Sequence, residues 1–281
     1  MTQQTQQTQQ QATGSDYARM ITVAVSAVIA VVGSFIGSGA AGGTPIQDAA
    51  GGALAADATV VAPGSGAFSI WSVIYAGLLA YAVWQFFPGQ RSAERHRRLG
   101  YWIAASLILN AAWILSIQFD QLWLSIPIIV ALLLVLIRSF LLARQYRGDG
   151  VIDAIITDGT IGLYLGWVTI ATVANITAGL VAVGFDGFGL DPDVWGVIVI
   201  AVAGLIGIGL ALRGEGRLAP TASLCWGIAW VAIARLTGDL LSTPTAVAAI
   251  IAVVAIVIVT IVARLRATTE DPDRIPAATV A

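Results

Sequence analysis

Long apolar runs alternate with short polar stretches along almost the whole chain. Eight of these runs approach the length of about 20 apolar residues that a helix needs to cross a hydrocarbon layer roughly 30 Å thick. They cover residues 20–40, 67–87, 100–118, 122–143, 156–182, 195–213, 219–237 and 245–265. The pattern predicts an all-α integral membrane protein. The seventh run contains Arg235, so a seven-span interpretation that omits it stays open.

Composition agrees with a chain that lies in a lipid bilayer. Hydrophobic residues make up 58% of the 281 residues and charged residues only 11%, which is unusual for a soluble domain. Residues 1–18 are rich in Gln and Thr and predict a disordered cytoplasmic tail. Because this tail has no basic segment, we expect the first span to stay as an anchor rather than to act as a signal peptide.

Arginine placement predicts the orientation of the spans. All 14 basic residues are arginine. Most of them follow the second, fourth, sixth and eighth spans, whereas the alternate loops carry aspartate. Cytoplasmic loops retain basic residues, so both termini are expected in the cytoplasm. The even number of crossings favours eight spans over seven.

Three clusters of aromatic and amide residues recur within the apolar runs and are the candidate binding site. Spacings of three and four residues place each cluster on one face of its helix. Trp rings beside an amide or a Tyr hydroxyl suit a flat, mostly apolar ligand with a few polar edges. The candidate ligand-binding residues are Phe68, Trp71, Tyr75, Asn110, Trp113, Tyr164, Trp167, Ala171 and Asn175.

Each cluster also has a structural interpretation. Tryptophan is common at membrane interfaces, but Trp167 lies near the middle of its span and is too deep for that role. Interfacial positions suit Trp84, Trp102, Trp123 and Trp195 better. Asn110 and Asn175 could instead form interhelical hydrogen bonds, typically worth about 0.6 kcal/mol.

The remaining polar residues indicate no catalytic or metal site. His96 is expected in a loop among arginines, and the single Cys225 excludes an intramolecular disulfide. Asp153 and Asp158 open the fifth span, where acids complement the helix dipole. Arg235 is expected to pair with Asp239 one turn later. The net charge of −2 argues against a nucleic-acid partner.

In their order along the chain, the clusters resemble the TspO family, the translocator or tryptophan-rich sensory proteins. That family has Trp-x-x-x-Tyr in its second helix, here Trp71 and Tyr75, and Asn-x-x-Trp in its third, here Asn110 and Trp113. Its fifth helix carries Tyr-x-x-Trp-x-x-x-Ala-Thr-x-x-Asn, which matches residues 164–175. The chain departs from the family before the second helix. The usual Pro-Pro-x-Trp is reduced to Ala62-Pro63-Gly64, and Gly66-Ala67-Phe68 stands where a Trp is usual.

The resemblance divides the chain into a TspO-like five-helix domain at 19–185, a three-helix extension at 186–266 and a flexible cytoplasmic tail at 267–281. It implies a protein of the bacterial cell membrane, a homodimer by family analogy, and no required cofactor. The implied ligand is a tetrapyrrole such as protoporphyrin IX or haem, and the implied role is porphyrin handling or stress response.

Two other functions remain open from the sequence. A porphyrin-degrading enzyme is disfavoured because the spans offer no metal ligands and no acid–base pair. A small-solute transporter is disfavoured by the scarcity of intramembrane charge and by the lack of an internal repeat. The long segment between the first two spans, residues 38–66, is a candidate lid because loops of this length are often functional.

Overall fold

The computed structural model describes residues 11–148 and 150–270 and consists of a bundle of long helices. Eight helices in this part of the chain are long and apolar enough to span a membrane, so the prediction of an all-α, eight-span protein is confirmed. The helices are α1 (Gly14–Gly37), η1 (Ala50–Gly52), η2 (Ser65–Ser69), α2 (Ile70–Trp84), α3 (Glu94–Gln118), α4 (Leu122–Gln145), α5 (Val151–Asp153), the π-helical η3 (Ala154–Gly159), α6 (Thr160–Ala182), η4 (Gly187–Gly189), α7 (Pro192–Arg213), α8 (Leu218–Thr237) and α9 (Thr243–Glu270).

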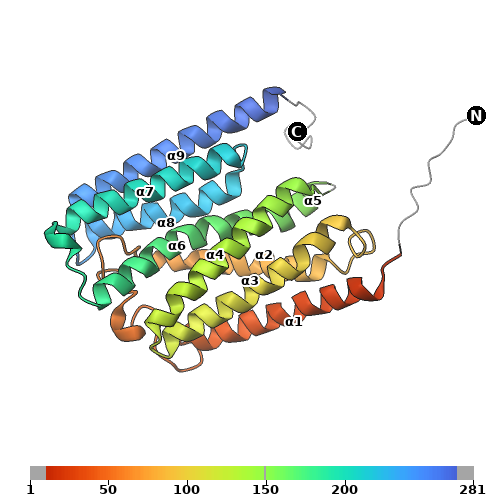
Figure 1. Ribbon diagram of the computed structural model, residues 1–281, viewed down its shortest axis with the longest axis horizontal. Coiled ribbons are helices and arrows are strands. Elements are labelled where there is room, and N and C mark those ends of the chain that lie inside the picture. Colours follow the sequence, from red (N-terminus) through yellow and green to blue (C-terminus); the bar gives the residue numbers. More distant parts are fainter. Residues whose placement is uncertain (1–10, 149, 271–281) are drawn as a thin grey trace, which may run out of the picture.

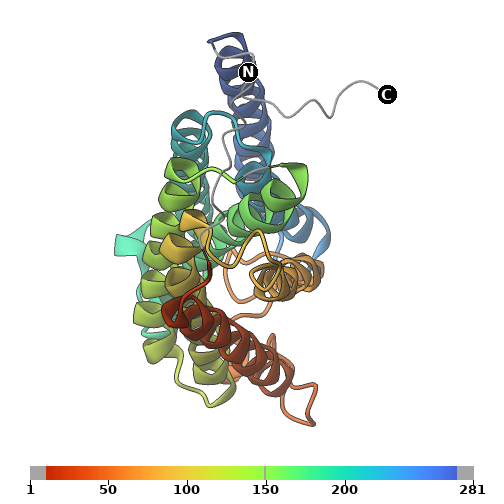
Figure 2. The same ribbon diagram turned by 90° about the vertical axis from the view of Figure 1, so that its right-hand side faces the viewer.

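The first five spans and the last three form two adjoining groups of helices (Figure 1). In the first group α3 lies between α1 and α4, and α6 packs against α4 and α2. In the second group α8 and α7 both pack against α9. Figure 2 shows the same arrangement from the side. Contact between α6 and α8 joins the two groups.

Helix α1 begins earlier than the sequence suggested. It starts at Gly14, where the side chains of Thr13 and Asp16 form a capping box. Asp16 also accepts two hydrogen bonds of 2.8 Å from Arg97 of α3. Residues 14–18 therefore belong to the first helix, and the tail expected at 1–18 ends before Gly14. Residues 1–10 lie outside the described part of the chain.

The expected C-terminal tail was also too long. Helix α9 continues to Glu270, so residues 267–270 are helical rather than part of the expected tail. Residues 271–281 lie outside the described residues. The start of α1 and the end of α9 lie at the same end of the bundle, as an even number of crossings requires (Figure 1).

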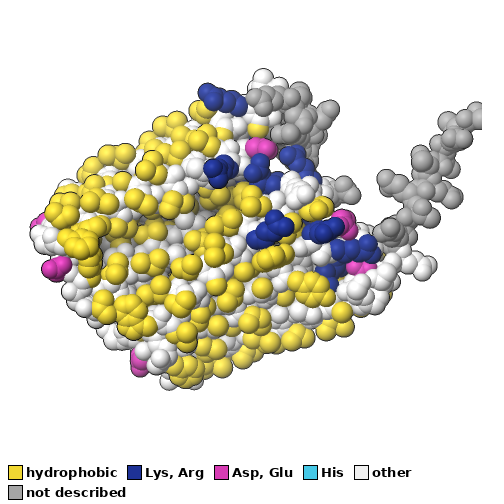
Figure 3. Space-filling view, in the orientation of Figure 1, with side chains coloured by type: hydrophobic (Ala, Val, Ile, Leu, Met, Phe, Trp, Pro, Cys, Tyr) yellow, Lys and Arg dark blue, Asp and Glu magenta, His cyan; other side chains and the backbone are white. Residues whose placement is uncertain are grey.

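Charged side chains separate to the two ends of the bundle. Arginines gather at the end where α4 stops and α9 ends, whereas the opposite end shows acidic groups (Figure 3). We call these the basic end and the acidic end. The flank between them is apolar, and even large side chains such as Leu205 and Ile155 are 68% and 66% exposed there. Such a surface is stable only in lipid, so the chain is an integral membrane protein.

Glycines allow two pairs of helices to approach closely. A Cβ at Gly166 of α6 would overlap the carbonyl oxygen of Pro220 in α8, and one at Gly227 would lie 2.5 Å from Ile170. Between α1 and α3, a Cβ at Gly33 would lie 3.0 Å from that of Ala111. Because helices in lipid associate through close van der Waals packing, these glycines stabilise the bundle. The Gly33-x3-Gly37 motif of α1 therefore packs against α3 of the same chain.

Adding one methyl group at the contact between α6 and α8 should destabilise the bundle. We expect Gly166→Ala to lower the free energy of unfolding by about 1–3 kcal/mol, because the new methyl meets backbone that cannot move aside. Thermal unfolding in detergent, followed by intrinsic fluorescence, measures the change. The matched control is Gly209→Ala in α7, where an added Cβ has no atom within 4 Å. Equal effects of the two substitutions would contradict the proposed importance of this contact.

Candidate ligand pocket

The aromatic residues from α2, η2 and α6 converge inside the bundle. Trp71 lies with its ring centroid 6.2 Å from Trp167 and 5.7 Å from Tyr164, both in edge-to-face contact. Phe68 meets Trp167 edge-on at 5.8 Å, and Tyr75 lies 5.5 Å from Trp71. Trp167 and Tyr164 are almost completely buried. The rings therefore face one another rather than the lipid.

A small cavity adjoins this ring cluster. Its volume is about 30 Å³, which is far below the roughly 300–1,000 Å³ of typical ligand pockets. Five of the nine predicted site residues line it: Phe68, Trp113, Trp167, Ala171 and Asn175. The other four, Trp71, Tyr75, Asn110 and Tyr164, do not line it. Trp71, Tyr75 and Tyr164 belong to the aromatic cluster, and Asn110 is bonded to Tyr75.

Hydrogen bonds fix the two asparagine amides in place. The indole N–H of Trp113 donates to Oδ1 of Asn175 at 2.7 Å, and Nδ2 of Asn175 donates to Ser125 of α4 at 2.9 Å. Nδ2 of Asn110 donates to the Tyr75 hydroxyl at 2.6 Å, and that hydroxyl also bonds to Ser34 of α1. Both amides therefore link helices, which is the structural role that the sequence left open for them.

Two polar groups of the cavity lining, the Trp167 indole N–H and the Thr59 hydroxyl, are buried without a partner among the described residues. The indole N–H of Trp167 is buried and forms no hydrogen bond with the described part of the chain. A buried donor without an acceptor is uncommon in proteins and costs free energy. This N–H is therefore available to a hydrogen-bond acceptor on a ligand in the cavity.

The loop between α1 and α2 closes the cavity from the acidic end. Ala53, Leu54, Thr59, Ala62 and Pro63 form this side of the lining. Farther along the loop, the backbone N–H of Ala50 donates to Asp120 at 3.0 Å. The position of the loop over the cavity agrees with the expectation that residues 38–66 contain a lid.

Arg235 of α8 holds this loop from the other helix group. Its guanidinium is 1% exposed and donates to the carbonyl oxygen of Thr59 at 3.0 Å and to that of Ala56. The expected pairing with Asp239 on the same helix was wrong, because the Arg235 side chain turns to the loop instead. Backbone carbonyls accept from both terminal nitrogens of the guanidinium without a second buried charge, whereas its buried Nε has no partner among the described residues.

Two tryptophans of α8 contact the next part of the loop. The indole N–H of Trp226 donates to the carbonyl oxygen of Ala67 at 3.0 Å, and the carbonyl oxygen of Trp230 accepts from the N–H of Gly64 at 3.1 Å. The Trp230 ring would overlap a Cβ at Gly66. The small residues that replace the TspO pattern before α2 therefore make room for α8.

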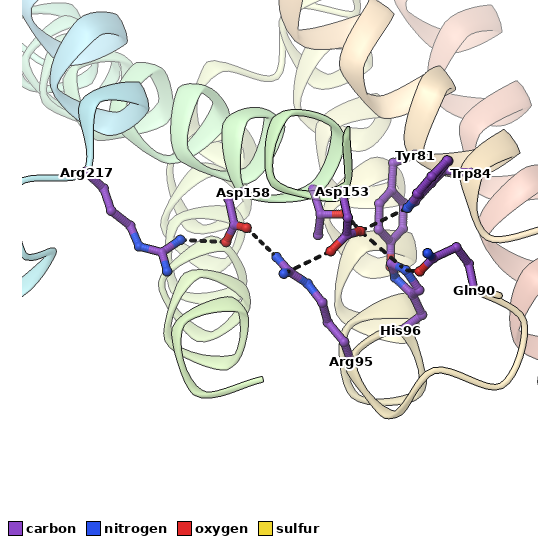
Figure 4. A network of polar contacts seen from close by, with 9 residues as sticks. Tyr81, Trp84, Gln90, Arg95, His96, Asp153, Asp158 and Arg217 are labelled. Atoms are coloured by element: carbon purple, nitrogen blue, oxygen red, sulfur yellow. Dashed lines mark hydrogen bonds and ion pairs between the residues drawn. The ribbon is translucent and has the colours of Figure 1, made fainter. Parts of the chain in front are cut away.

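A network of buried charges at the basic end was not predicted from the sequence (Figure 4). Arg95 of α3 forms ion pairs with Asp153 at 3.0 Å and with Asp158 at 2.7 Å. Asp158 also pairs with Arg217, which precedes α8, at 2.5 Å. Asp153, which is 1% exposed, accepts further hydrogen bonds from Trp84 at 2.9 Å and Thr157 at 2.8 Å.

Several expectations for these residues were wrong. His96 lies in the first turn of α3 rather than in a loop, is fully buried, and contacts Gln90 at 2.9 Å. Trp84, expected at the interface, also donates a hydrogen bond to Asp153. Asp153 and Asp158 form ion pairs across helices rather than only complementing a dipole. Asp153 directly precedes the π-helical segment Ala154–Gly159, and Asp158 lies within it. A π-helical turn brings residues five apart closer to one face than an α-helix does.

Comparison with protein families agrees with this arrangement of rings, amides and spans. The family description "TSPO-like protein" matches residues 23–263. The chain belongs to this family. The match of the TSPO-like family includes α7, α8 and most of α9, so the last three spans fall within the matched region. No curated protein and no solved structure matches the chain.

Neutralising one buried acid of the network should destabilise this TSPO-like protein. Asp153→Asn removes one of the two carboxylates that face buried Arg95. Breaking a buried ion pair from one side costs about 3–5 kcal/mol, so we expect a loss of about 3 kcal/mol in the free energy of unfolding, measured in detergent with urea. Glu94→Gln is the control, because its pair with Arg98 is exposed and such pairs contribute at most about 1 kcal/mol.

Proposed function

We propose that this TSPO-like protein is a membrane receptor that binds a planar hydrophobic ligand between the rings of Phe68, Trp113 and Trp167. The observation that carries the proposal is the unpartnered N–H of Trp167 beside an apolar cavity. Flat aromatic faces favour a conjugated ring, and the indole N–H favours an acceptor at its edge. A tetrapyrrole such as protoporphyrin IX or haem combines these properties.

Binding of such a ligand requires the loop over the cavity to move. A volume of about 30 Å³ holds roughly one water molecule, not a tetrapyrrole. Half of the cavity-facing side chains come from residues 53–68 rather than from α3 and α6. Displacing this segment would open the cavity toward the acidic end without rearranging the long helices.

The proposed setting is a bacterial cell membrane with both termini in the cytoplasm. The basic end carries the arginine-rich loops, and such loops face the cytoplasm in most membrane proteins. The binding site would then open toward the outside. We propose a role in porphyrin handling or stress response on the family resemblance. A homodimer would need a face other than Gly33-x3-Gly37, which contacts α3.

Removing the central indole should weaken tetrapyrrole binding. We expect Trp167→Ala to raise the dissociation constant for protoporphyrin IX about tenfold, since one aromatic contact is worth roughly 0.5–1.5 kcal/mol beyond its buried area. Titration of the purified protein in detergent, followed by the Soret absorption of the ligand, measures the change. Trp71→Ala removes the ring behind Trp167 and should weaken binding less.

The control for this titration is Trp195→Ala. That indole lies at the acidic end, where it donates to the carbonyl oxygen of Gly187 at 2.7 Å and lies outside the cavity. Unchanged binding in Trp167→Ala, or equal loss in Trp195→Ala, would reject the site. Light-dependent loss of the Soret band with a new product would favour a porphyrin-degrading enzyme, and counterflow in proteoliposomes would favour a transporter.

Removing the Arg235 contacts should loosen the loop without unfolding α8. Arg235→Met keeps an apolar side chain in the span but leaves the carbonyls of Ala56 and Thr59 without their charged donor. We expect faster hydrogen exchange at residues 50–64, with unchanged protection in α6 and α8, and faster association of protoporphyrin IX. Arg266→Met, at an exposed position of α9, is the control. Unchanged exchange in the loop would show that other contacts hold it closed.

A further inference from the structure

A second and larger cavity lies on the flank of the bundle, apart from the ring cluster. It is a groove of about 740 Å³ between α2, the π-helical segment and the start of α8. It shares no lining residue with the cavity beside Trp167. Its volume falls within the roughly 300–1,000 Å³ of typical ligand sites, whereas the cavity beside Trp167 is far smaller.

Small residues of α2 form one wall of the groove. Val73, Ala76, Gly77 and Ala80 lie at helical spacing along it, over a length of about 10 Å at 1.5 Å per residue. A Cβ at Gly77 would overlap the side chain of Thr160, so the two helices touch at the floor of the groove. Ile155, which is 66% exposed, and Leu218 form its rims. The groove is therefore apolar and open to lipid.

Arginines surround the end of the groove that lies nearest the basic end. The groove continues into a polar cavity of about 280 Å³, and both share Asp158, Arg217 and Arg264. Arg95 and Arg147 also line the polar cavity, together with Glu215. Arg95 also pairs with Asp153, and Arg144 also pairs with Glu215. With these partners counted, five described arginines face three described acids, which leaves an excess of two positive charges.

The arginines around the polar cavity differ in whether their guanidinium groups have acidic partners. Arg95 and Arg217 pair with Asp158, and Arg147 lies 3.6 Å from Glu215. Arg264 of α9 forms no ion pair or side-chain hydrogen bond with any described residue and is exposed. Its backbone lies directly beside Gly216, which places it against the loop that carries Arg217. An anion between Arg217 and Arg264 would offset part of this excess of positive charge.

The apolar groove and the excess of arginine at its end are together complementary to a phospholipid. A phospholipid has acyl chains that replace the solvating lipid in such a groove and a phosphate at the depth of the interface. Arginine binds phosphate through two parallel hydrogen bonds, and basic pockets between helices are typical sites for anionic headgroups.

We propose that an anionic phospholipid occupies this groove, with an acyl chain along α2 and its phosphate between Arg217 and Arg264. The bound lipid would lie between the first five spans and the last three, since α2 and the π-helical segment belong to one group and Arg217 and Arg264 to the other. It would thereby fasten the two helix groups together at the basic end.

Native mass spectrometry of the full-length protein, with phosphatidylglycerol and phosphatidylcholine of identical acyl chains, tests the proposal. We expect preferential retention of phosphatidylglycerol and about a fivefold weaker binding in Arg264→Gln, the change expected for removing one arginine at an anionic headgroup. Arg266→Gln removes the same charge two residues farther along α9, outside both cavities, and should bind as the unaltered protein does.

A second pair of variants tests the apolar part of the groove. Ala76→Trp fills it and should reduce retention of phosphatidylglycerol, whereas Val83→Trp places the same ring on the exposed face of α2, outside the groove. Equal retention of both lipids, or equal effects of Arg264→Gln and Arg266→Gln, would overturn the proposal. Displacement of the lipid by protoporphyrin IX in an Arg264-dependent manner would also overturn it, because the occupant would then be a tetrapyrrole. If no tetrapyrrole binds beside Trp167, the proposed function fails, but the lipid site in this groove is unaffected.

Discussion

The close contact between α6 and α8 joins the two helix groups and brings α8 to the loop over the ring cluster. Glycines at 162, 166 and 227 remove the side chains that would otherwise separate these helices. Lipid supplies no hydrophobic drive for two apolar helices to associate, so contact area gained through small residues is decisive. Once α8 lies against α6, its tryptophans and Arg235 reach the loop that covers the ring cluster. The loop over the cavity beside Trp167 is therefore held by a helix that lies outside the first five spans.

Much of the fold and part of the site could be predicted from the sequence because their signals are local. Apolar length alone indicates eight spans, and helical spacing alone puts Trp167, Ala171 and Asn175 on one face. The sequence grouped Phe68, Trp71 and Trp167 as one candidate site from the recurrence of aromatic clusters and the family resemblance. Their ring contacts could not be derived from spacing, since nothing in the spacing of one helix says which other helix it faces. The small size of the cavity depends on how the rings interlock, which no pattern along the chain reports.

The charged residues were predicted least well. Arg235 has Asp239 one turn away, and local spacing favoured that pair, but its two terminal guanidinium nitrogens donate to carbonyls 176 and 179 residues distant in the sequence. Asp153 and Asp158 pair with the same arginine across a π-helical segment that begins after Asp153 and contains Asp158. Departures from α-helical period leave no clear mark in composition. In both cases the sequence suggested an interaction within one helix, and the side chain instead forms contacts with a residue distant in the sequence.

The hold of Arg235 on the loop also has a consequence for the order in which the protein matures. Membrane proteins are made from the N-terminus, and the loop at residues 50–64 leaves the ribosome well before residue 235 is synthesised. Until the seventh span is inserted, the loop over the ring cluster lacks its hydrogen bonds from Arg235. The cover over the cavity beside Trp167 is therefore completed only when α8 arrives, after most of the chain has entered the membrane.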